Sequence, residues 1–316
     1  MSSIPWVVPA AWPDRSPARM ASRIRTDSPE SCEVALLGLP DDLGVRMNGG
    51  RPGAAAGPGA FRAALARYGS ATPDGVEWPA IFDAGDVTPA EGTDAAVLGE
   101  THRRVTEATR ALLERGLFPI AVGGGHDLTY PFVRAVVVEH RRRHGDVPFG
   151  GVYFDAHLDV REEAGSGMPF RRLMEDCRVG PLNVVGVSGL VNSREHAAYY
   201  AGRGGLFDGR AVVQGRLVEA AGPLGTPATP AGFVSLDMDC LDQSFAPGVS
   251  AMNPMGLSPR EVAARVVALG ASPWVRCFDI MELNPSHDEG GRTARLAAHL
   301  FLTFLGGWAR RPAGAR

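Results

Sequence analysis

GGVYFDAHLDVRE, residues 150–162, decides how this sequence is interpreted, because an apolar run ends in acidic and histidine side chains. In an extended chain, side chains two residues apart point to the same side. If the strand continues that far, Asp155, His157 and Asp159 are therefore predicted to converge on one point. Arg161 continues the same alternation by one more step.

Two other apolar runs end in the same residue types. SLDMD (235–239) carries Asp237 and Asp239 on one predicted face, and AVGGGHD (121–127) places His126 after a glycine turn. All three stretches fall at the carboxyl ends of predicted strands, which is the edge where open α/β sheets bind ligands. Each stretch alone is consistent with a turn or a polar strand end, but the three together predict one shared site.

Charge decides what the shared site would hold. Four aspartates crowded at one sheet edge repel one another, and some would stay protonated. Two histidines and four aspartates are too many ligands for one ion, but they suit two ions that share carboxylates. Nitrogen and oxygen ligands without a thiolate favour Mn²⁺ over Fe²⁺, Co²⁺ or Zn²⁺. Two such ions hold a bridging water as hydroxide at neutral pH, which predicts hydrolysis.

The rest of the chain alternates between strand and helix patterns, as expected for a mostly parallel sheet between helical layers. Near-continuous apolar runs, typical of strands covered on both faces, predict strands at 33–39, 80–85, 117–125, 150–157, 182–189, 211–215, 232–239 and 275–283. Helices are predicted at 59–68, 96–116, 128–144, 193–204, 258–269 and 291–307. The predicted fold class is therefore α/β, a three-layer sandwich with a central sheet of about eight strands.

Composition limits the partners. The formal net charge of −3 predicts neither a nucleic-acid nor a membrane partner. The four cysteines form no CxxC pair and the first residues lack a secretory pattern, so a cytoplasmic protein is expected. No apolar run reaches the roughly 20 residues that span a bilayer. Residues 1–31 are predicted as an N-terminal arm and residues 32–316 as a single domain.

The ordered motifs GGGHD, DAHLD and SLDMD resemble those of the ureohydrolase family, which includes arginases, agmatinases, guanidinobutyrases and formimidoylglutamases. The resemblance spans residues 33–307 and implies an arginase-like catalytic domain with two Mn²⁺ per subunit. It implies that one ion is held by His126, Asp155, Asp159 and Asp237, and the other by His157, Asp155, Asp237 and Asp239, with Asp155 and Asp237 bridging. FDIMELNP (278–285) implies that Glu282 receives the cationic amidine or guanidine, and that Asp159 also hydrogen-bonds the attacking hydroxide.

Residues 166–170, SGMPF, resemble the corresponding loop of formimidoylglutamases, whereas arginases carry a histidine there. This resemblance implies hydrolysis of N-formimidoyl-L-glutamate to L-glutamate and formamide, a step of histidine degradation. Arg161 would then pair with a substrate carboxylate, because a guanidinium binds a carboxylate through two hydrogen bonds. Further candidates for contacts to the glutamate end are Ser166, Asn48, Arg46 and Asn192.

Other interpretations stay open. Met168 and Met252 depart from the formimidoylglutamase pattern near the expected pocket. The main alternative is therefore another ureohydrolase that acts on a guanidino acid or on agmatine and releases urea. A metal-binding scaffold subunit and a single-zinc deacetylase on a similar sheet are the remaining alternatives. The family resemblance also implies a homo-oligomer, a trimer or a hexamer, and a small amidine or guanidino substrate that bears a carboxylate.

Overall fold

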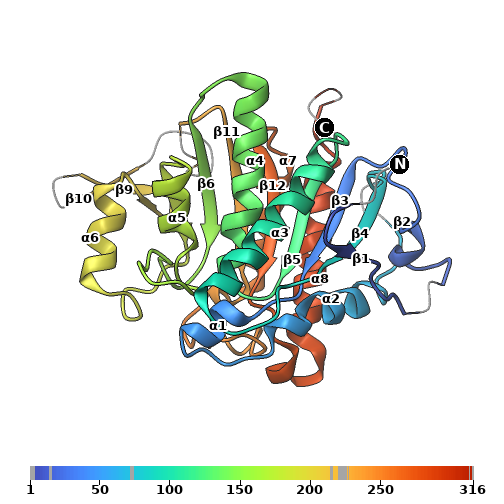
Figure 1. The fold of residues 1–316 in the computed structure, drawn as a ribbon, viewed down its shortest axis with the longest axis horizontal. Helices are drawn as coiled ribbons and strands as arrows, with labels where there is room; N and C mark the ends of the chain where they lie inside the picture. Colours follow the sequence, from blue (N-terminus) through green and yellow to red (C-terminus); the bar gives the residue numbers. More distant parts are fainter. Residues whose placement is uncertain are drawn as a thin grey trace.

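The structure is a computed structural model that describes residues 4–13, 16–71, 75–213, 216–219, 226, 228–312 and 314. Within this part of the chain, one twelve-stranded sheet is covered by helices on both faces (Figure 1). The strands are β1 Val7–Val8, β2 Ile24–Arg25, β3 Val34–Leu39, β4 Ile81–Val87, β5 Phe118–Gly123, β6 Phe149–Phe154, β7 Leu182–Val185, β8 Leu206–Phe207, β9 Arg210–Val213, β10 Arg216–Glu219, β11 Ala231–Asp237 and β12 Val275–Met281. The α-helices are α1 Leu43–Met47, α2 Gly57–Leu65, α3 Ala95–Leu113, α4 Thr129–His144, α5 Pro169–Asp176, α6 Arg194–Gly202, α7 Pro259–Ala271 and α8 Arg292–Trp308. The short 3-10 helices are η1 Met20–Arg23, η2 Ala54–Ala56, η3 His126–Leu128, η5 Met238–Cys240, η6 Pro285–His287 and η7 Glu289–Gly291.

The strand order brings distant parts of the chain together. Along the sheet the order is β1-β4-β3-β5-β12-β11-β6-β7-β8-β9-β10, with β2 beside β4. From β4 to β8 neighbouring strands are parallel, whereas β1, β9 and β10 pair antiparallel. Because β11 and β12 lie between β5 and β6, four strands from both halves of the chain end side by side.

Both faces of the sheet are covered, which confirms the three-layer prediction. Along β3, Val34 and Leu36 belong to the core shared with α2, α7 and α8. Ala35 and Leu37 belong to the opposite core, shared with α3, α4 and α5. Since successive side chains of a strand point to opposite faces, a strand buried on both sides reads as one continuous apolar run.

The eight predicted strands and six predicted helices are present, with ends that differ by a few residues. Residues 214–215 of the predicted strand 211–215 lie outside the described residues. Four further strands, β1, β2, β8 and β10, are not predicted; β1, β2 and β8 have two residues each and β10 has four, too few for a recognisable pattern. Helices α1 and α5 are not predicted, and α5 begins at Pro169 inside an expected loop. None of the described helices is long and apolar enough to cross a lipid bilayer.

The described part of residues 1–31 contributes to the edge of the same sheet. Strands β1 and β2 both pair with β4. Behind β4, the buried Arg62 of α2 forms ion pairs with Asp83 at 2.8 Å and with Asp86 at 2.6 Å. The indole N–H of Trp12 donates a hydrogen bond to Asp83 at 2.6 Å. The division into an arm and a domain stays a prediction.

Candidate metal centre

Four neighbouring strands bring the predicted site residues to one edge of the sheet. His126 follows β5, Asp155 follows β6, Asp237 ends β11 and Glu282 follows β12. These strands lie side by side in the order β5-β12-β11-β6. Their carboxyl ends form the edge at which parallel sheets bind ligands.

The chain reaches this arrangement by turning, which corrects the prediction that strand alternation aligns the ligands. β6 ends at Phe154, and residues 155–159 belong to no strand. Asp159 has a φ of +47°, a left-handed conformation that is uncommon outside glycine. Similarly, β11 ends at Asp237, and η5 follows it directly. Asp155 and Asp237 thus stand at the last paired positions of their strands, and the turns that follow bring Asp159 and Asp239 toward the same site.

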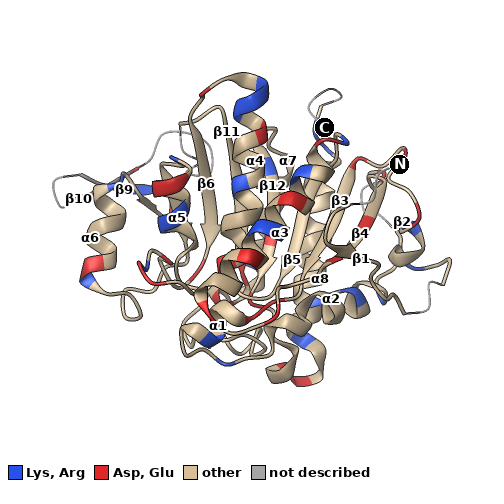
Figure 2. Ribbon diagram, viewed as in Figure 1, with Lys and Arg blue, Asp and Glu red and all other residues tan. Residues whose placement is uncertain are grey.

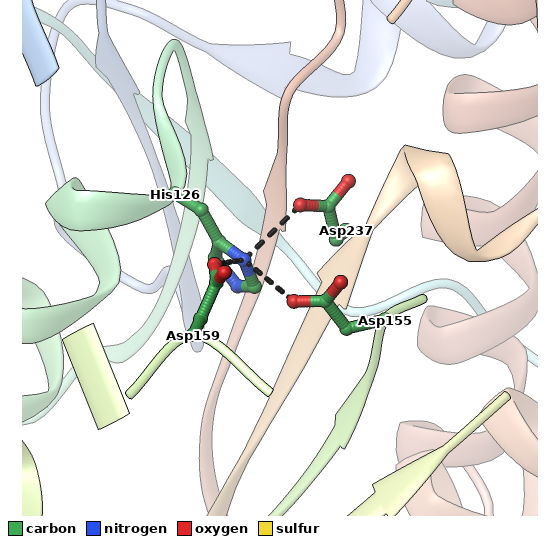
Figure 3. A group of neighbouring side chains, drawn as sticks. All are labelled: His126, Asp155, Asp159 and Asp237. Carbon is green, nitrogen blue, oxygen red and sulfur yellow. Dashed lines mark ion pairs between the residues drawn. The ribbon is translucent and has the colours of Figure 1, made fainter. Parts of the chain in front are cut away.

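Three aspartates surround one ring nitrogen of His126 (Figure 3). The Nδ1 atom of His126 lies 3.1 Å from an oxygen of Asp155, 3.0 Å from one of Asp159 and 3.1 Å from one of Asp237. Asp159 is partly exposed, and the other three residues are buried. These four residues are the first of the two predicted ligand sets.

A second group lies next to the first. The Nδ1 atom of His157 is 3.3 Å from Oδ1 of Asp155 and 3.1 Å from Oδ2 of Asp239. Since Asp155 turns its other oxygen toward His126, this carboxylate belongs to both groups. Among the described residues, Asp237 belongs to the first group alone, and its Oδ1 accepts a hydrogen bond from the backbone N–H of Asp239 at 2.7 Å. The bridging role of Asp237 stays a prediction.

The residues present fit divalent cations. One imidazole nitrogen donates at most one hydrogen bond, but three carboxylate oxygens surround Nδ1 of His126. That atom and Oδ2 of Asp155 have no hydrogen-bond partner among the described residues. Neighbouring ligands of an octahedral ion, each at about 2.1 Å, lie about 3.0 Å apart, which matches the contacts of His126. Imidazole and carboxylate ligands in such a set suit Mn²⁺.

The crowded charges alter the proton affinities of both groups. Burial, together with Asp159 and Asp239, raises the pKa of Asp155 to about 6. Burial by itself lowers the pKa of His157, but Asp239 and Asp155 outweigh it and raise that pKa to about 12. Bound protons thus neutralise part of the negative charge that a divalent cation would otherwise neutralise. Metal binding displaces these protons from the ligands.

The second ring nitrogen of His126 is held by residues that sequence reasoning missed. Nε2 lies 3.0 Å from the hydroxyl of Ser235, which donates to Oδ1 of Asp279 at 2.5 Å. Ser235 therefore accepts the Nε2–H of His126, and this tautomer leaves the Nδ1 lone pair for a metal. Both residues had a signal in the sequence. Ser235 stands two residues before Asp237, and Asp279 is a carboxylate inside an apolar strand, where it needs a partner.

Glu282 lies beside the two ligand groups and has one carboxylate oxygen that makes no hydrogen bond with the described residues. Its Oε1 accepts a hydrogen bond from the backbone N–H of His126 at 2.9 Å, and its φ is +63°. Its Oε2 is buried and makes no hydrogen bond with the described residues. Burial raises the pKa of Glu282 to about 8. A buried carboxylate with a free oxygen suits the predicted role of receiving a cationic amidine.

A cavity of about 130 Å³ opens beside the two groups. The predicted substrate contacts Arg161, Ser166 and Asn48 line it together with His157, Asp159, Asp237, Asp239 and Glu282. Arg46 does not line it and instead pairs with Asp42 at 3.2 Å. Asn192 does not line it either, because its side-chain amide donates to the carbonyl of Ala156 at 2.9 Å and so supports the ligand loop.

Met168 and Met252, the two departures that left other substrates as alternatives, also lie outside this cavity. Met168 is 4% exposed and packs in the core between the sheet and α5. Met252 is 52% exposed, and neither side chain lines the cavity. Neither departure from the formimidoylglutamase pattern therefore changes the wall of the cavity.

The fold and the paired histidine–aspartate groups define a metal-dependent hydrolase of C–N bonds. The sequence profile of the Arginase family matches residues 32–306, so this chain belongs to the Arginase family. Formimidoylglutamase of Aromatoleum aromaticum is 38% identical over 307 residues, covering 90% of this chain and 85% of that protein. The structure of formimidoylglutamase from Bacillus subtilis has a TM-score of 0.78 at 26% identity and covers 96% of each chain. The crystal structure of Trypanosoma cruzi formiminoglutamase with Mn²⁺ has a TM-score of 0.77 at 31% identity, with 93% of this chain and 99% of that chain covered.

Proposed function

We propose that this chain is a two-manganese hydrolase that converts N-formimidoyl-L-glutamate and water into L-glutamate and formamide. The observation that carries the proposal is a single cavity that joins both ligand groups, the carboxylate of Glu282 and the guanidinium of Arg161. The similar proteins named above are formimidoylglutamases, and one of them was crystallised with Mn²⁺.

Two Mn²⁺ ions, held by His126, Asp155, Asp159 and Asp237 and by His157, Asp155 and Asp239, would lower the pKa of a water molecule to about 7 and polarise the amidine. Glu282 binds the amidinium with its free oxygen, because its other oxygen is fixed by the backbone of His126. This contact holds the amidine carbon toward the attacking water.

We assign to Asp159 the handling of the proton of the attacking water. It is the most exposed of the four aspartates, at 13%, and it lines the cavity. It accepts a hydrogen bond from the water and so orients the oxygen lone pair toward the amidine carbon. The new carbon–oxygen bond forms, the bond to the glutamate nitrogen breaks, and the proton passes to that nitrogen.

We assign to Arg161 the binding of a carboxylate of the substrate. It is exposed at the cavity, and its backbone N–H donates to the carbonyl of Gly167 at 2.8 Å. The backbone N–H of Ser166 donates to Gly44, and the N–H of Gly167 donates to Asn48. Because these bonds tie the loop to α1, the guanidinium is presented from an ordered segment. Asn48 thus positions the loop, and Ser166 lines the cavity beside it.

A substrate panel tests the proposal. We expect the Mn²⁺-loaded enzyme to release glutamate and formamide from N-formimidoyl-L-glutamate, and little or no urea from guanidinobutyrate, guanidinopropionate, arginine or agmatine. Glu282→Gln keeps the shape of the side chain but removes its charge, so it should abolish turnover while Mn²⁺ still binds. Efficient urea release from agmatine or a guanidino acid would instead assign the chain to another ureohydrolase.

We also propose that the enzyme works in the cytoplasm as a homo-oligomer, a trimer or a hexamer. All four cysteines are free thiols in the structure, which fits a reducing compartment. The oligomeric proposal rests on family resemblance. Sedimentation equilibrium of the Mn²⁺-loaded protein measures it, and a monomer at micromolar concentration would contradict it.

A further inference from the structure

One polar residue of the active-site cavity has no role in the proposed reaction. Ser250 lies in the loop 241–258, between η5 and α7, and lines the cavity beside Ala251. The other polar side chains that line it are predicted metal ligands, Glu282 or the predicted substrate contacts named above. The Oγ atom of Ser250 is buried and has no hydrogen-bond partner among the described residues. Because a buried polar atom without a partner is destabilising, this hydroxyl needs a partner that the described residues do not supply.

Ser250 lies close to Glu282, which has the same need. Oε2 of Glu282 is buried and also lacks a hydrogen-bond partner in the described part of the chain. Burial raises the pKa of this carboxyl to about 8, and the hydroxyl of Ser250 exerts the largest opposing effect, so the two groups are neighbours. Two neighbouring oxygen atoms in one cavity therefore lack a donor, and a ligand with two N–H groups satisfies both.

The loop that carries Ser250 is held from two sides. The guanidinium of Arg51 donates to the backbone carbonyl of Ser250 at 3.2 Å. The backbone N–H of Asn284 donates to the carbonyl of Gly248 at 2.8 Å. Asn284 stands two residues after Glu282. The segment that carries the carboxylate therefore also fixes the loop that carries the hydroxyl, and the two groups are held in a set relation to each other.

The charge beside Ser250 comes from Glu282. Figure 2 shows acidic residues gathered near α1, at the end of the sheet where β12 leads to Glu282. Bound metal neutralises the predicted ligands at this end, but Glu282 belongs to neither ligand group of the described residues. The ligand at Ser250 and Glu282 is therefore a single cation that carries N–H groups, and an amidinium meets both conditions.

We propose that Ser250 is a substrate-binding residue, whose Oγ accepts one N–H of the amidinium while Oε2 of Glu282 accepts another. This inference deepens the proposed function and rests on it, because the amidinium is that of N-formimidoyl-L-glutamate. The two nitrogens of an amidinium lie in one plane with the carbon between them. Two adjacent acceptors therefore fix the direction of that plane as well as the position of the carbon, whereas one carboxylate oxygen leaves the group free to turn about a single hydrogen bond. Ser250 thus determines which face of the amidine carbon meets the attacking water.

Steady-state kinetics of the Mn²⁺-loaded Ser250→Ala enzyme test this contact. We expect kcat/KM for N-formimidoyl-L-glutamate to fall about 10- to 100-fold, because a hydrogen bond to a charged group is lost. Mn²⁺ affinity, measured by titration of metal-free protein, should not change. Ser250→Thr keeps the hydroxyl and should lose less than Ser250→Ala. Ser244→Ala is the matched control, since Ser244 is an exposed serine of the same loop that does not line the cavity, and it should leave kcat/KM unchanged.

Formamidinium, an amidinium without the glutamate, probes the same contact without the reaction. Isothermal titration of the Mn²⁺-loaded protein should show binding that Ser250→Ala weakens about as much as it lowers kcat/KM, and that Ser244→Ala leaves unchanged. This titration separates the residue from the substrate. If the unsubstituted enzyme turned over only guanidino compounds while formamidinium binding still depended on Ser250, the proposed substrate would be wrong and the contact would stand.

Two results would overturn the role of Ser250. One is a Ser250→Ala enzyme that binds formamidinium as tightly as the unsubstituted protein and hydrolyses N-formimidoyl-L-glutamate with unchanged kcat/KM. The other is a loss of Mn²⁺ affinity in Ser250→Ala that accounts for its loss of turnover, because the serine would then act through the metal centre. Circular dichroism verifies that each variant is folded.

Discussion

Two clusters of inward-facing aspartates differ in the source of their positive charge. On strand β4, Asp83 and Asp86 are neutralised by Arg62, at 2.8 Å and 2.6 Å. At the carboxyl ends of β5, β6 and β11, four aspartates have only two imidazoles between them. A buried carboxylate needs a cation or a proton. The first cluster carries its cation within the chain and is structural, whereas the second must take its cations from solution, and this difference separates a scaffold from a metal centre.

Removing the internal cation gives the largest expected effect. Arg62→Met keeps the apolar volume of the side chain but leaves the carboxylate of Asp83 buried without its cation. We expect the free energy of unfolding to fall by about 3–5 kcal/mol, measured by urea denaturation. Arg67→Gln, an exposed arginine just after α2, is the control and should change little. Equal effects of the two substitutions would break the distinction between the clusters.

Removing the external cations should have the next largest effect. If Mn²⁺ is present at a hundred times its Kd, chelation should lower the free energy of unfolding by about 2.7 kcal/mol, because the aspartates regain their repulsion. The measurement compares urea unfolding of the loaded and the EDTA-treated enzyme. In Asp237→Asn the first ligand group is incomplete, so chelation should matter less there. The same loss in both proteins would contradict the ligand assignment.

The hydrogen bonds from His126 to Ser235 and from Ser235 to Asp279 provide a finer test of the second cluster. Asp279→Asn should reduce Mn²⁺ affinity about 10- to 100-fold, because the amide no longer polarises Ser235 and His126. Titration of metal-free protein with Mn²⁺ measures this. Ser235→Ala interrupts the same path, so the double variant should lose no more affinity than the more severe single variant. Additive losses would show that the two residues act separately.

The smallest expected effect lies outside both clusters. Arg161→Gln should raise KM for N-formimidoyl-L-glutamate about tenfold and change kcat less, because the contact binds ground state and transition state alike. Arg46→Gln is the control, since that side chain lies outside the cavity. If Arg46→Gln raised KM as much as Arg161→Gln, the carboxylate of the substrate would be bound elsewhere.

Sequence reasoning could predict the layers and the ligand positions, because both depend on local patterns. Val34–Leu39 is apolar on both faces, and this pattern indicates a strand that is buried between two helical layers. His126, Asp155 and Asp237 stand at the ends of such runs, so the shared edge follows from the parallel topology.

The remaining features depend on contacts between distant segments. The left-handed backbone of Asp159 and the link from Ser235 to Asp279 form only when β6, β11 and β12 are neighbours. Arg46 and Asn192 have suitable side chains for a substrate, but the structure directs them to Asp42 and to the backbone of the ligand loop. No local pattern distinguishes these uses of the same residue types.

His126 connects the parts of the active site mechanically. Its Nδ1 faces three aspartates, its Nε2 leads through Ser235 to β12, and its backbone N–H holds Glu282. One residue thus sets the separation between the metal ligands and the carboxylate that receives the amidine. A shift of the turn after β5 therefore moves the ring of His126 and its hydrogen bond to Glu282 together. The distance between the metal ligands and the carboxylate of Glu282 is preserved even if the sheet flexes, and with it the position of the substrate's reactive carbon.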